Sequence, residues 1–299
     1  MALDPDSATP RGALRPVERL LLAYLAFTTL LGLRRWSAQP AIGWVLLSNL
    51  LGVLLVWLNL RARPSRIGLA LREVYPLLLL GALYPAIDLL NGFGAIEVHD
   101  ATIQRWELGL FGTELSQAWW QAAPSRFWSA LLHAAYFAYY PIVLGPVILF
   151  LLTGRTEAAR RAVLWLMGTF FFCYAVFLLF PVAGPYYEFP RPAAWFLDNG
   201  PARLVYATLE RGSAYGAAFP SSHVAATLVA TAVAFLGSRR MGWVLVTPAI
   251  LLTIGVVYCQ MHYAVDAIAG IVIGLAVVGL GLRYEQRRGP DTGQVPGPL

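Results

Sequence analysis

The chain has 299 residues, of which 58% are hydrophobic and only 13% are charged, with a formal net charge of +6. Roughly a quarter of the residues in a soluble domain are charged, so this composition excludes an ordinary water-soluble fold. All 22 basic residues are arginines that stand mainly between apolar runs, so the positive charge is a signal of membrane topology and we expect no nucleic-acid partner.

Apolar runs long enough to cross a bilayer, about 17 to 25 residues each, recur along almost the whole chain. Unpaired backbone groups have no water to bond at membrane depth, so we expect each run to form an α-helix. The first and third runs are short, and the predicted fold is therefore an all-α, polytopic transmembrane bundle of about eight spans, within a range of six to eight. The predicted spans are 17–33, 41–60, 74–90, 130–152, 163–182, 221–237, 243–260 and 264–282.

Polar segments flank this region at both ends of the sequence. Residues 1–16 form a polar N-terminal segment, and the Gly/Pro-rich tail 289–299 is expected to be disordered. Residues 17–288 are expected to form a single transmembrane domain. No obvious signal-peptide cleavage site follows the first apolar run, so we expect that run to remain as a helix.

The distribution of arginines predicts the orientation, because loops rich in Arg and Lys stay in the cytoplasm. If the chain starts in the cytoplasm, 15 of the 22 arginines lie on that side and 7 on the other. We therefore expect both termini in the cytoplasm and two long loops, 91–129 and 183–220, on the extracytoplasmic side.

The first of these loops contains a stretch with helical periodicity at 100–112. We interpret it as an amphipathic helix on the outer membrane surface, either a simple interfacial anchor or a lid over the lipid entrance. Its apolar face holds Ile103, Trp106 and Leu110, and Gln104, Arg105 and Glu107 lie elsewhere.

The second loop ends in Phe219-Pro220-Ser221-Ser222-His223, directly before an apolar run. Proline is tolerated in a first helical turn, and a serine side chain can cap free backbone N–H groups, so this motif predicts a helix start. Free N–H groups and the positive end of the helix dipole attract anions. We expect Ser221 and Ser222 to bind a phosphate, with His223 in the same turn.

A second motif, His262-Tyr263-Ala264-Val265-Asp266, precedes the last span. The i, i+4 spacing lets Asp266 accept the Nδ1 hydrogen of His262, which frees the other ring nitrogen as a nucleophile or base. Such an ionisable pair at the membrane boundary is by default a candidate functional site. Both motifs start spans on the same side, so we expect them to meet, and small residues that repeat every four positions favour the close approach. These small residues are Ala226, Ala230, Ala234, Gly270 and Gly274.

Together the two motifs resemble those of the type 2 phosphatidic acid phosphatase superfamily, with Pro-Ser-x-His at one helix start and His-Tyr-x-x-Asp one hairpin later. The aromatic and proline-rich run 180–187 looks like that of its inositol phosphorylceramide synthase branch. The resemblance covers about 180–275 and places the catalytic core at about 163–285.

This resemblance implies a double displacement without a cofactor or metal. His262 would attack phosphorus to give a phosphohistidine, and Asp266 would hold its tautomer. His223 would protonate the leaving oxygen and then activate water or an acceptor hydroxyl.

Two positions depart from the pattern of the superfamily's phosphatases. Gly184 stands where they carry a Lys seven residues before an Arg-Pro pair, and Val256 where they carry an Arg six residues before the second His. The loss of two phosphate ligands favours the transferase branch, with Arg191 as the best substitute cation. Tyr186 and Tyr187 are expected to line the head-group pocket, and Arg203 and Arg211 are alternative cations.

The sequence thus predicts an integral-membrane enzyme with membrane lipids as partners and its active site on the extracytoplasmic side, and it leaves the oligomeric state open. The favoured activity is lipid phosphotransfer of an inositol phosphate-like head group. Alternatives are a lipid phosphate or isoprenyl diphosphate phosphatase, a non-catalytic lipid transporter or scramblase, and, more remotely, a zinc site.

Overall fold

The computed structural model describes residues 13–37, 39–61 and 66–288. Most of the predicted N-terminal segment and the whole predicted tail lie outside these residues. Within the described part of the chain the regular structure is helical, apart from one isolated parallel bridge between Val182 and Ala217. The helices are α1 (Pro16–Arg35), α2 (Ile42–Arg61), α3 (Arg66–Leu83), α4 (Pro85–Leu90), the 3-10 turn η2 (Gly92–Gly94), α5 (Asp100–Phe111), α6 (Leu115–Ala122), α7 (Arg126–Phe137), α8 (Tyr139–Leu152), α9 (Thr156–Leu179), α10 (Pro185–Glu188), α11 (Ala194–Leu197), α12 (Gly200–Gly212), α13 (Ser222–Gly237), α14 (Arg239–Tyr258) and α15 (Ala264–Arg288).

Seven helical segments in the described residues are long and apolar enough to cross a membrane. An eighth apolar helix, α13, has only 16 residues and lies among them. The prediction of an all-α polytopic bundle with six to eight spans is confirmed. The seven segments are Pro16–Arg35, Ile42–Arg61, Leu71–Gly94, Arg126–Leu152, Thr156–Leu179, Arg239–Tyr258 and Ala264–Arg287.

Two of the predicted spans are interrupted rather than continuous. The run 74–90 is built from α3 and α4, and the run 130–152 from α7 and α8. Pro85 starts α4, and Pro141 lies in the first turn of α8. Because proline has no N–H to donate to the carbonyl four residues earlier, the helical hydrogen-bond ladder breaks at both places.

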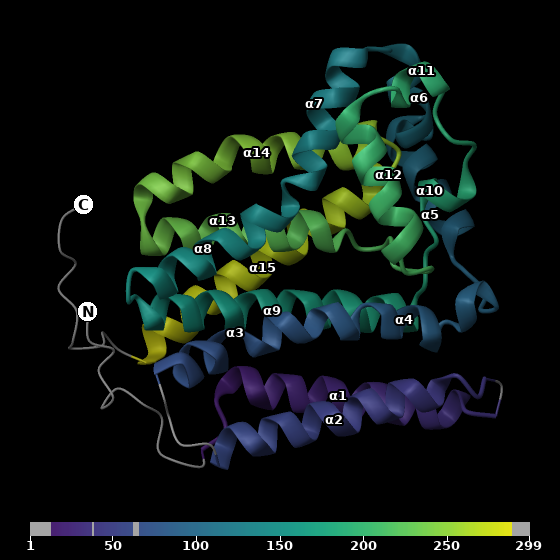
Figure 1. Ribbon diagram of the computed structural model, residues 1–299. Helices are drawn as coiled ribbons and strands as arrows, with labels where there is room; N and C mark the ends of the chain where they lie inside the picture. Colours follow the sequence, from purple (N-terminus) through teal and green to yellow (C-terminus); the bar gives the residue numbers. More distant parts are fainter. Residues whose placement is uncertain (1–12, 38, 62–65, 289–299) are drawn as a thin grey trace.

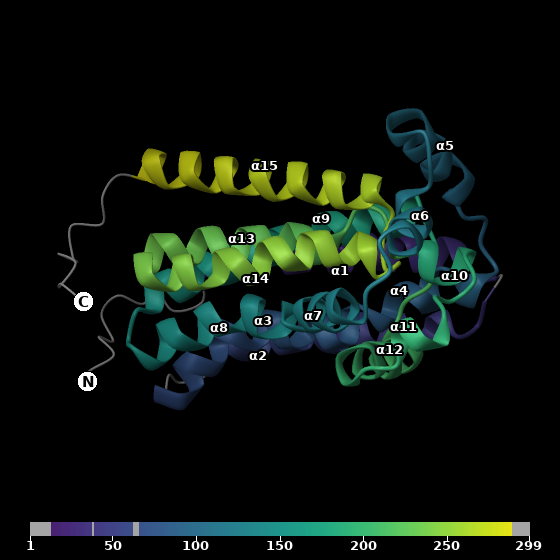
Figure 2. The same ribbon diagram turned by 90° about the horizontal axis from the view of Figure 1, so that it is seen from above.

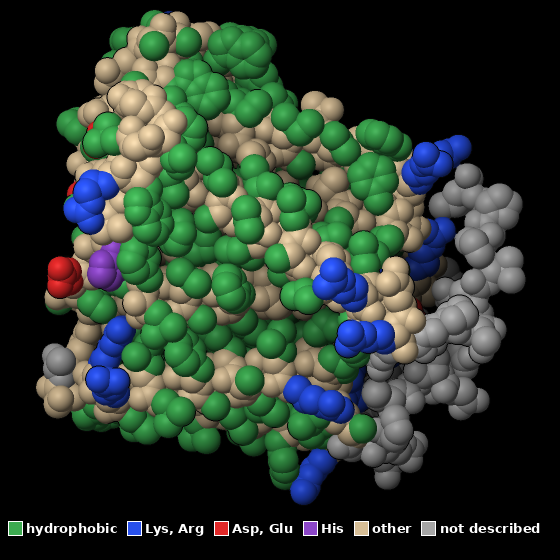
Figure 3. Space-filling model, turned by 180° about the vertical axis from the view of Figure 1, so that it is seen from behind, with side chains coloured by type: hydrophobic (Ala, Val, Ile, Leu, Met, Phe, Trp, Pro, Cys, Tyr) green, Lys and Arg blue, Asp and Glu red, His purple; other side chains and the backbone are tan. Residues whose placement is uncertain are grey.

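The first turn of α1 and the last turn of α15 lie at the same end of the bundle (Figure 1). The predicted outer loops are not irregular: they fold into α5, α6, α10, α11 and α12, which gather at the opposite end (Figures 1 and 2). On the face drawn in Figure 3, hydrophobic side chains form a broad band between the ends, and basic side chains are more frequent toward the end that holds the first turn of α1 and the last turn of α15. The assignment of that end to the cytoplasm stays a prediction.

Helix α13 occupies the centre of the bundle and packs against α8, α9, α14 and α15. Its contact with α15 depends on two glycines of α15. A Cβ atom at Gly270 would lie 2.6 Å from the carbonyl oxygen of Ser221, and one at Gly274 would lie 3.1 Å from that of Ala225. The absence of side chains lets the two backbones approach, as predicted, and brings the start of α13 against the start of α15.

Candidate active site

His262 lies in the turn between α14 and α15, two residues before α15 starts, and is only 4% exposed. Its Nδ1 atom is 3.3 Å from Oδ2 of Asp266, which is fully buried in the first turn of α15. The same carboxylate oxygen accepts the backbone N–H of Tyr263 at 2.9 Å. The predicted pair therefore forms. Asp266 contacts both the ring of His262 and the backbone N–H of Tyr263.

The protonation state of His262 follows from its burial. Removal from water lowers the pKa of His262 from 6.5 to about 4, and a hydrogen bond with the backbone of Ala218 opposes the shift only in part. The imidazole is therefore neutral at pH 7. A neutral ring whose Nδ1 hydrogen is donated to a carboxylate has a free lone pair on Nε2, which a nucleophile requires.

His223 is the second residue of α13 and meets His262 at a ring-centroid distance of 5.6 Å. The rings of Tyr136 and Tyr139 lie 4.8 and 4.4 Å from it. Its Nδ1 atom and Oδ1 of Asp266 are buried without a hydrogen-bond partner, so the site holds unused hydrogen-bonding capacity. Among the described residues, no group of three His, Cys, Asp or Glu side chains is arranged to hold a metal ion.

The serines before His223 are both buried. Ser221 caps α13 by accepting the N–H of Val224 at 3.4 Å, and its own N–H donates to the backbone carbonyl of Asp266 at 3.0 Å. This confirms the predicted capping role of Ser221. Because its N–H is bonded to the carbonyl of Asp266, that group is not available to an anion. Helix geometry leaves the N–H groups of Ser222 and His223 without intrahelical acceptors, so these two are the donors available to an anion.

The loop after α9 pairs with the segment that precedes the Ser221 helix start. Val182 donates its N–H to the carbonyl of Gly216 at 3.2 Å and accepts the N–H of Ala218 at 2.9 Å. Two residues later, Gly184 has a φ of 92°, and a Cβ atom there would lie 2.7 Å from the Cβ of Ala218. Position 184, where the resembling phosphatases carry a lysine, therefore has no room for a side chain.

Val256 occupies the other position at which a phosphate ligand is missing. It is fully buried in α14, and its carbonyl oxygen accepts the N–H groups of Met261 and His262 at 3.0 and 2.8 Å. Position 256 therefore shapes the turn that carries His262 through its backbone, while its side chain contributes to the core.

The structure does not bring Arg191 to the histidines. Its guanidinium group is 3.1 Å from a carboxylate oxygen of Glu210, and both side chains are more than half exposed. It also lies over the rings of Tyr186 and Tyr206, at 5.8 and 5.4 Å. No contact within the described part of the chain joins Arg191 to His223 or His262. The aromatic pair of Tyr186 and Tyr187, at 4.9 Å, belongs to the same surface.

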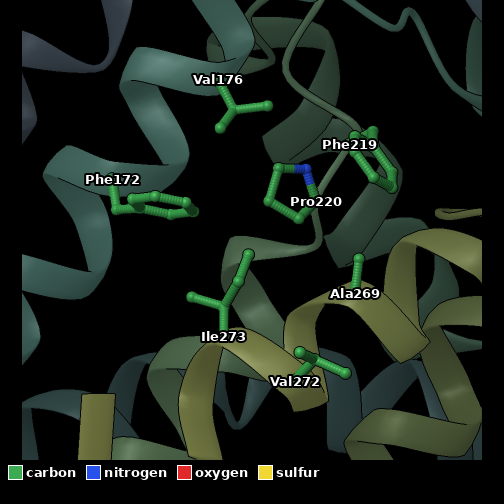
Figure 4. A pocket seen from close by; sticks show the side chains of 7 residues that line it. All are labelled: Phe172, Val176, Phe219, Pro220, Ala269, Val272 and Ile273. Atoms are coloured by element: carbon green, nitrogen blue, oxygen red, sulfur yellow. The ribbon is translucent and has the colours of Figure 1, made fainter. Parts of the chain in front are cut away.

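An apolar hollow of about 330 Å³ opens directly beside the start of α13 (Figure 4). Helix α9 lines it from one side and α15 from the other, and the segment before Ser221 closes it. Since every lining side chain is hydrophobic, the hollow suits a hydrocarbon chain. The lining residues are Phe172, Val176, Phe219, Pro220, Ala269, Val272 and Ile273.

The predicted helix at 100–112 exists as α5, and its placement on the membrane surface stays a prediction. Glu107 is fully buried and Asp100 is 3% exposed, whereas Trp106 and Leu110 are 48% and 65% exposed. The buried polar residues hydrogen-bond to the turn that follows His262. Sequence reasoning missed this role, although the 100, 104, 107 spacing places three polar residues on one helical face.

Comparison with known proteins identifies a family for this chain. A family model described as the PAP2 superfamily matches residues 102–280, which is more than half of the chain and includes both histidine motifs. No curated protein and no solved structure matches the chain.

Proposed function

The chain belongs to the PAP2 superfamily, and from this membership we propose that it is an integral-membrane lipid phosphotransferase. It moves a phospho-head-group, inositol phosphate-like in character, from one lipid to a hydroxyl group of another. The observation that carries the proposal is the meeting of His223 with a buried, neutral His262 that Asp266 holds by Nδ1.

The first step forms a phosphohistidine. The lone pair on Nε2 of His262 attacks phosphorus, and the bond between phosphorus and the oxygen of the leaving lipid breaks. His223 acts as the general acid and donates a proton to that oxygen. Asp266 stabilises the positive charge that develops on the ring of His262 as the P–N bond forms.

The second step reverses these roles. The acceptor hydroxyl gives its proton to His223, and its oxygen attacks phosphorus. The P–N bond then breaks, and His262 returns to its neutral form. If water takes the place of the acceptor, the same groups carry out hydrolysis, and the enzyme is a lipid phosphate or isoprenyl diphosphate phosphatase.

The apolar hollow between α9 and α15 supports a lipid as the substrate. Its wall includes Pro220, next to Ser221 at the start of α13. A lipid whose phosphate binds the N–H groups of Ser222 and His223 would place its hydrocarbon chain beside this hollow. We further propose, from the bias in arginine distribution, that the site faces the extracytoplasmic side.

Head-group contacts are proposed for Tyr186, Tyr187 and Arg191. Because Arg191 is paired with Glu210 on the surface, a contact with phosphate requires it to exchange that partner. Phosphoryl transfer depends mainly on positioning and charge neutralisation, so a cation that reaches the phosphate would be useful. Gly184 and Val256 cannot serve as phosphate ligands, which favours transfer over hydrolysis.

The test is an assay of head-group transfer and phosphate release by the detergent-purified wild type and the His262→Ala variant. Substrates are phosphatidate, an isoprenyl diphosphate and phosphatidylinositol, the last with ceramide or diacylglycerol as acceptor. We expect transfer by the wild type and none by the variant. Phosphate release without an acceptor would instead identify the phosphatase. Activity that survives the substitution, or its absence with every substrate, would overturn the enzymatic proposal and favour lipid transport.

A further inference from the structure

Three polar side chains of helix α5 face the turn that follows His262. The side-chain amide of Gln104 donates to the hydroxyl of Tyr263 at 2.9 Å, and this hydroxyl donates to Oδ1 of Asp100 at 3.0 Å. Oε1 of Glu107 accepts the backbone N–H of Ala264 at 2.9 Å. Tyr263 and Ala264 are the two residues that directly follow His262, so all three polar contacts act on the segment between His262 and Asp266.

Asp100 extends these contacts to the loop after α9. Its carboxylate accepts the N–H groups of Ala183 and Gly184 at 2.7 and 2.8 Å, in addition to the Tyr263 hydroxyl. One buried side chain thus joins two segments that are distant in the sequence. A small apolar cluster around Tyr263 encloses these bonds and comprises Ile103, Val182, Ala218, Tyr263 and Val265.

Glu107 is a fully buried carboxylate between the starts of two helices. Its Oε1 accepts the N–H of Ala264, the first residue of α15, at 2.9 Å. The backbone N–H of Leu115, the first residue of α6, also acts on the carboxylate, although Oε2 makes no hydrogen bond of good geometry. Removing a carboxylate from water is unfavourable unless its partners compensate for the loss. Because this side chain contacts the turn that follows His262, it is a candidate for orienting that turn.

The charges around Glu107 come from two elements. Asp266 on α15 and Glu114, just after α5, are both acidic, and the N–H groups of Ala264 and Leu115 oppose them. Burial, which is the main cause, and these two acidic groups raise the pKa of Glu107 from 4.5 to about 7, although the Ala264 and Leu115 N–H groups lower it. The carboxyl group therefore changes its charge near neutral pH while it holds the start of α15.

We propose that Glu107 is a positioning residue of the phosphoryl-transfer site, which fixes the first turn of α15 and thereby the alignment of Asp266 with His262. This inference rests on the proposed function. The ionised carboxylate accepts the Ala264 N–H more strongly than the neutral acid does, because a charged acceptor makes a shorter and stronger hydrogen bond. The alignment of the catalytic pair then improves as Glu107 loses its proton.

The experiment compares Glu107→Ala and Glu107→Gln with the wild type in the transfer assay, with His262→Ala as the inactive reference. Glutamine keeps an acceptor oxygen for Ala264, and alanine removes it. We expect kcat of the alanine variant to fall about 10- to 100-fold with KM changed less than about twofold, because small misplacements of reacting groups slow chemistry by such factors. The glutamine variant should recover kcat to within about threefold at pH 8. Arg105→Ala, on the exposed side of the same helix, is the matched control and should leave both constants unchanged.

A second readout separates positioning from a general folding effect. The wild-type kcat should rise through pH 7 relative to that of Glu107→Gln, whose side chain does not ionise. A wild-type kcat in the alanine variant, a loss confined to KM, or identical pH profiles of wild type and glutamine variant would overturn the inference. If the alanine variant does not fold, the pH profiles of the wild type and of Glu107→Gln test the inference without it. Wild-type activity that does not depend on His262 would instead refute the proposed function.

Discussion

Oδ2 of Asp266 lies 3.3 Å from Nδ1 of His262 and 2.9 Å from the backbone nitrogen of Tyr263. One carboxylate oxygen thus orients the proposed nucleophile and the turn that carries it. A neutral imidazole whose Nδ1–H is held in this way has its lone pair on Nε2. The catalytic competence of the site should therefore depend on this carboxylate more than on any other acidic group.

Asp266→Asn should lower kcat by about 100- to 10,000-fold with little change in KM, because an amide can stabilise the wrong tautomer of His262 and carries no charge to balance the imidazolium. Transfer kinetics of the purified variant provide the measurement. Asp198→Asn removes a carboxylate that is more than half exposed and should leave kcat unaltered. Equal effects of the two substitutions would contradict the role of Asp266.

Ala269→Trp should fill the apolar hollow between α9 and α15 and raise KM for a long-chain lipid about tenfold, since it removes space for several buried methylene groups. A short-chain analogue of the same lipid should be affected much less. Ile268, the neighbouring residue, does not line the hollow, so Ile268→Trp is the matched control. An equal rise in KM for the long-chain and the short-chain lipid would show that the hollow does not hold the lipid chain.

Arg191→Ala should raise KM about tenfold if the guanidinium contacts the substrate phosphate, with little effect on thermal stability because exposed ion pairs contribute roughly 0–1 kcal/mol. Glu210→Gln releases Arg191 from its present partner and should leave KM unchanged or lower it. A KM that is insensitive to both substitutions would remove Arg191 from the substrate site.

Gly184→Ala should destabilise the protein by about 1–3 kcal/mol, because a residue with a Cβ is strained at positive φ and the new atom meets Ala218. Thermal unfolding in detergent measures the effect. Gly109→Ala is the control, since a Cβ at that helical position of α5 meets nothing within 4 Å, and it should stabilise α5 slightly. A wild-type melting temperature for Gly184→Ala would contradict the close packing at the loop after α9.

Glu107 should make stability depend on pH. Its pKa is raised from 4.5 to about 7 in the folded protein, so the folded state holds this proton more tightly than the unfolded chain does. Its contribution is therefore fully present below pH 4.5 and is lost as the pH rises through 7, by at most about 3 kcal/mol.

Because glutamine does not ionise, the melting temperature of Glu107→Gln should rise relative to the wild type as the pH increases from 5 to 8. The exposed Glu97 offers a comparison, and Glu97→Gln should leave the melting temperature close to that of the wild type. A constant difference for Glu107→Gln would mean that Glu107 does not ionise near neutral pH in the folded protein.

Most of the fold could be predicted from the sequence, because a membrane span is a local property of about 20 apolar residues. The interruptions at Pro85 and Pro141 could not be located in this way, because Pro76, Pro146 and Pro248 lie inside continuous helices. The folding of the outer loops into α5, α6, α10, α11 and α12 was predicted only for α5. These helices pack against the end of the bundle, and such packing is not visible in a linear pattern.

The sequence by itself indicated the pairing of His262 with Asp266 and the helix start at His223, because both depend on residues close together in the chain, although His262 lies in the turn before α15 rather than on the helix. It also indicated that the two motifs meet, through the small residues of α13 and α15. Only the tertiary structure decided that Arg191 pairs with Glu210 and that α5 buries Asp100 and Glu107. In a membrane protein an apolar helical face can turn to lipid as readily as to the core. The hydrophobic pattern of α5 therefore cannot tell which face packs against the site, and its contacts with Tyr263 and Ala264 settle the matter.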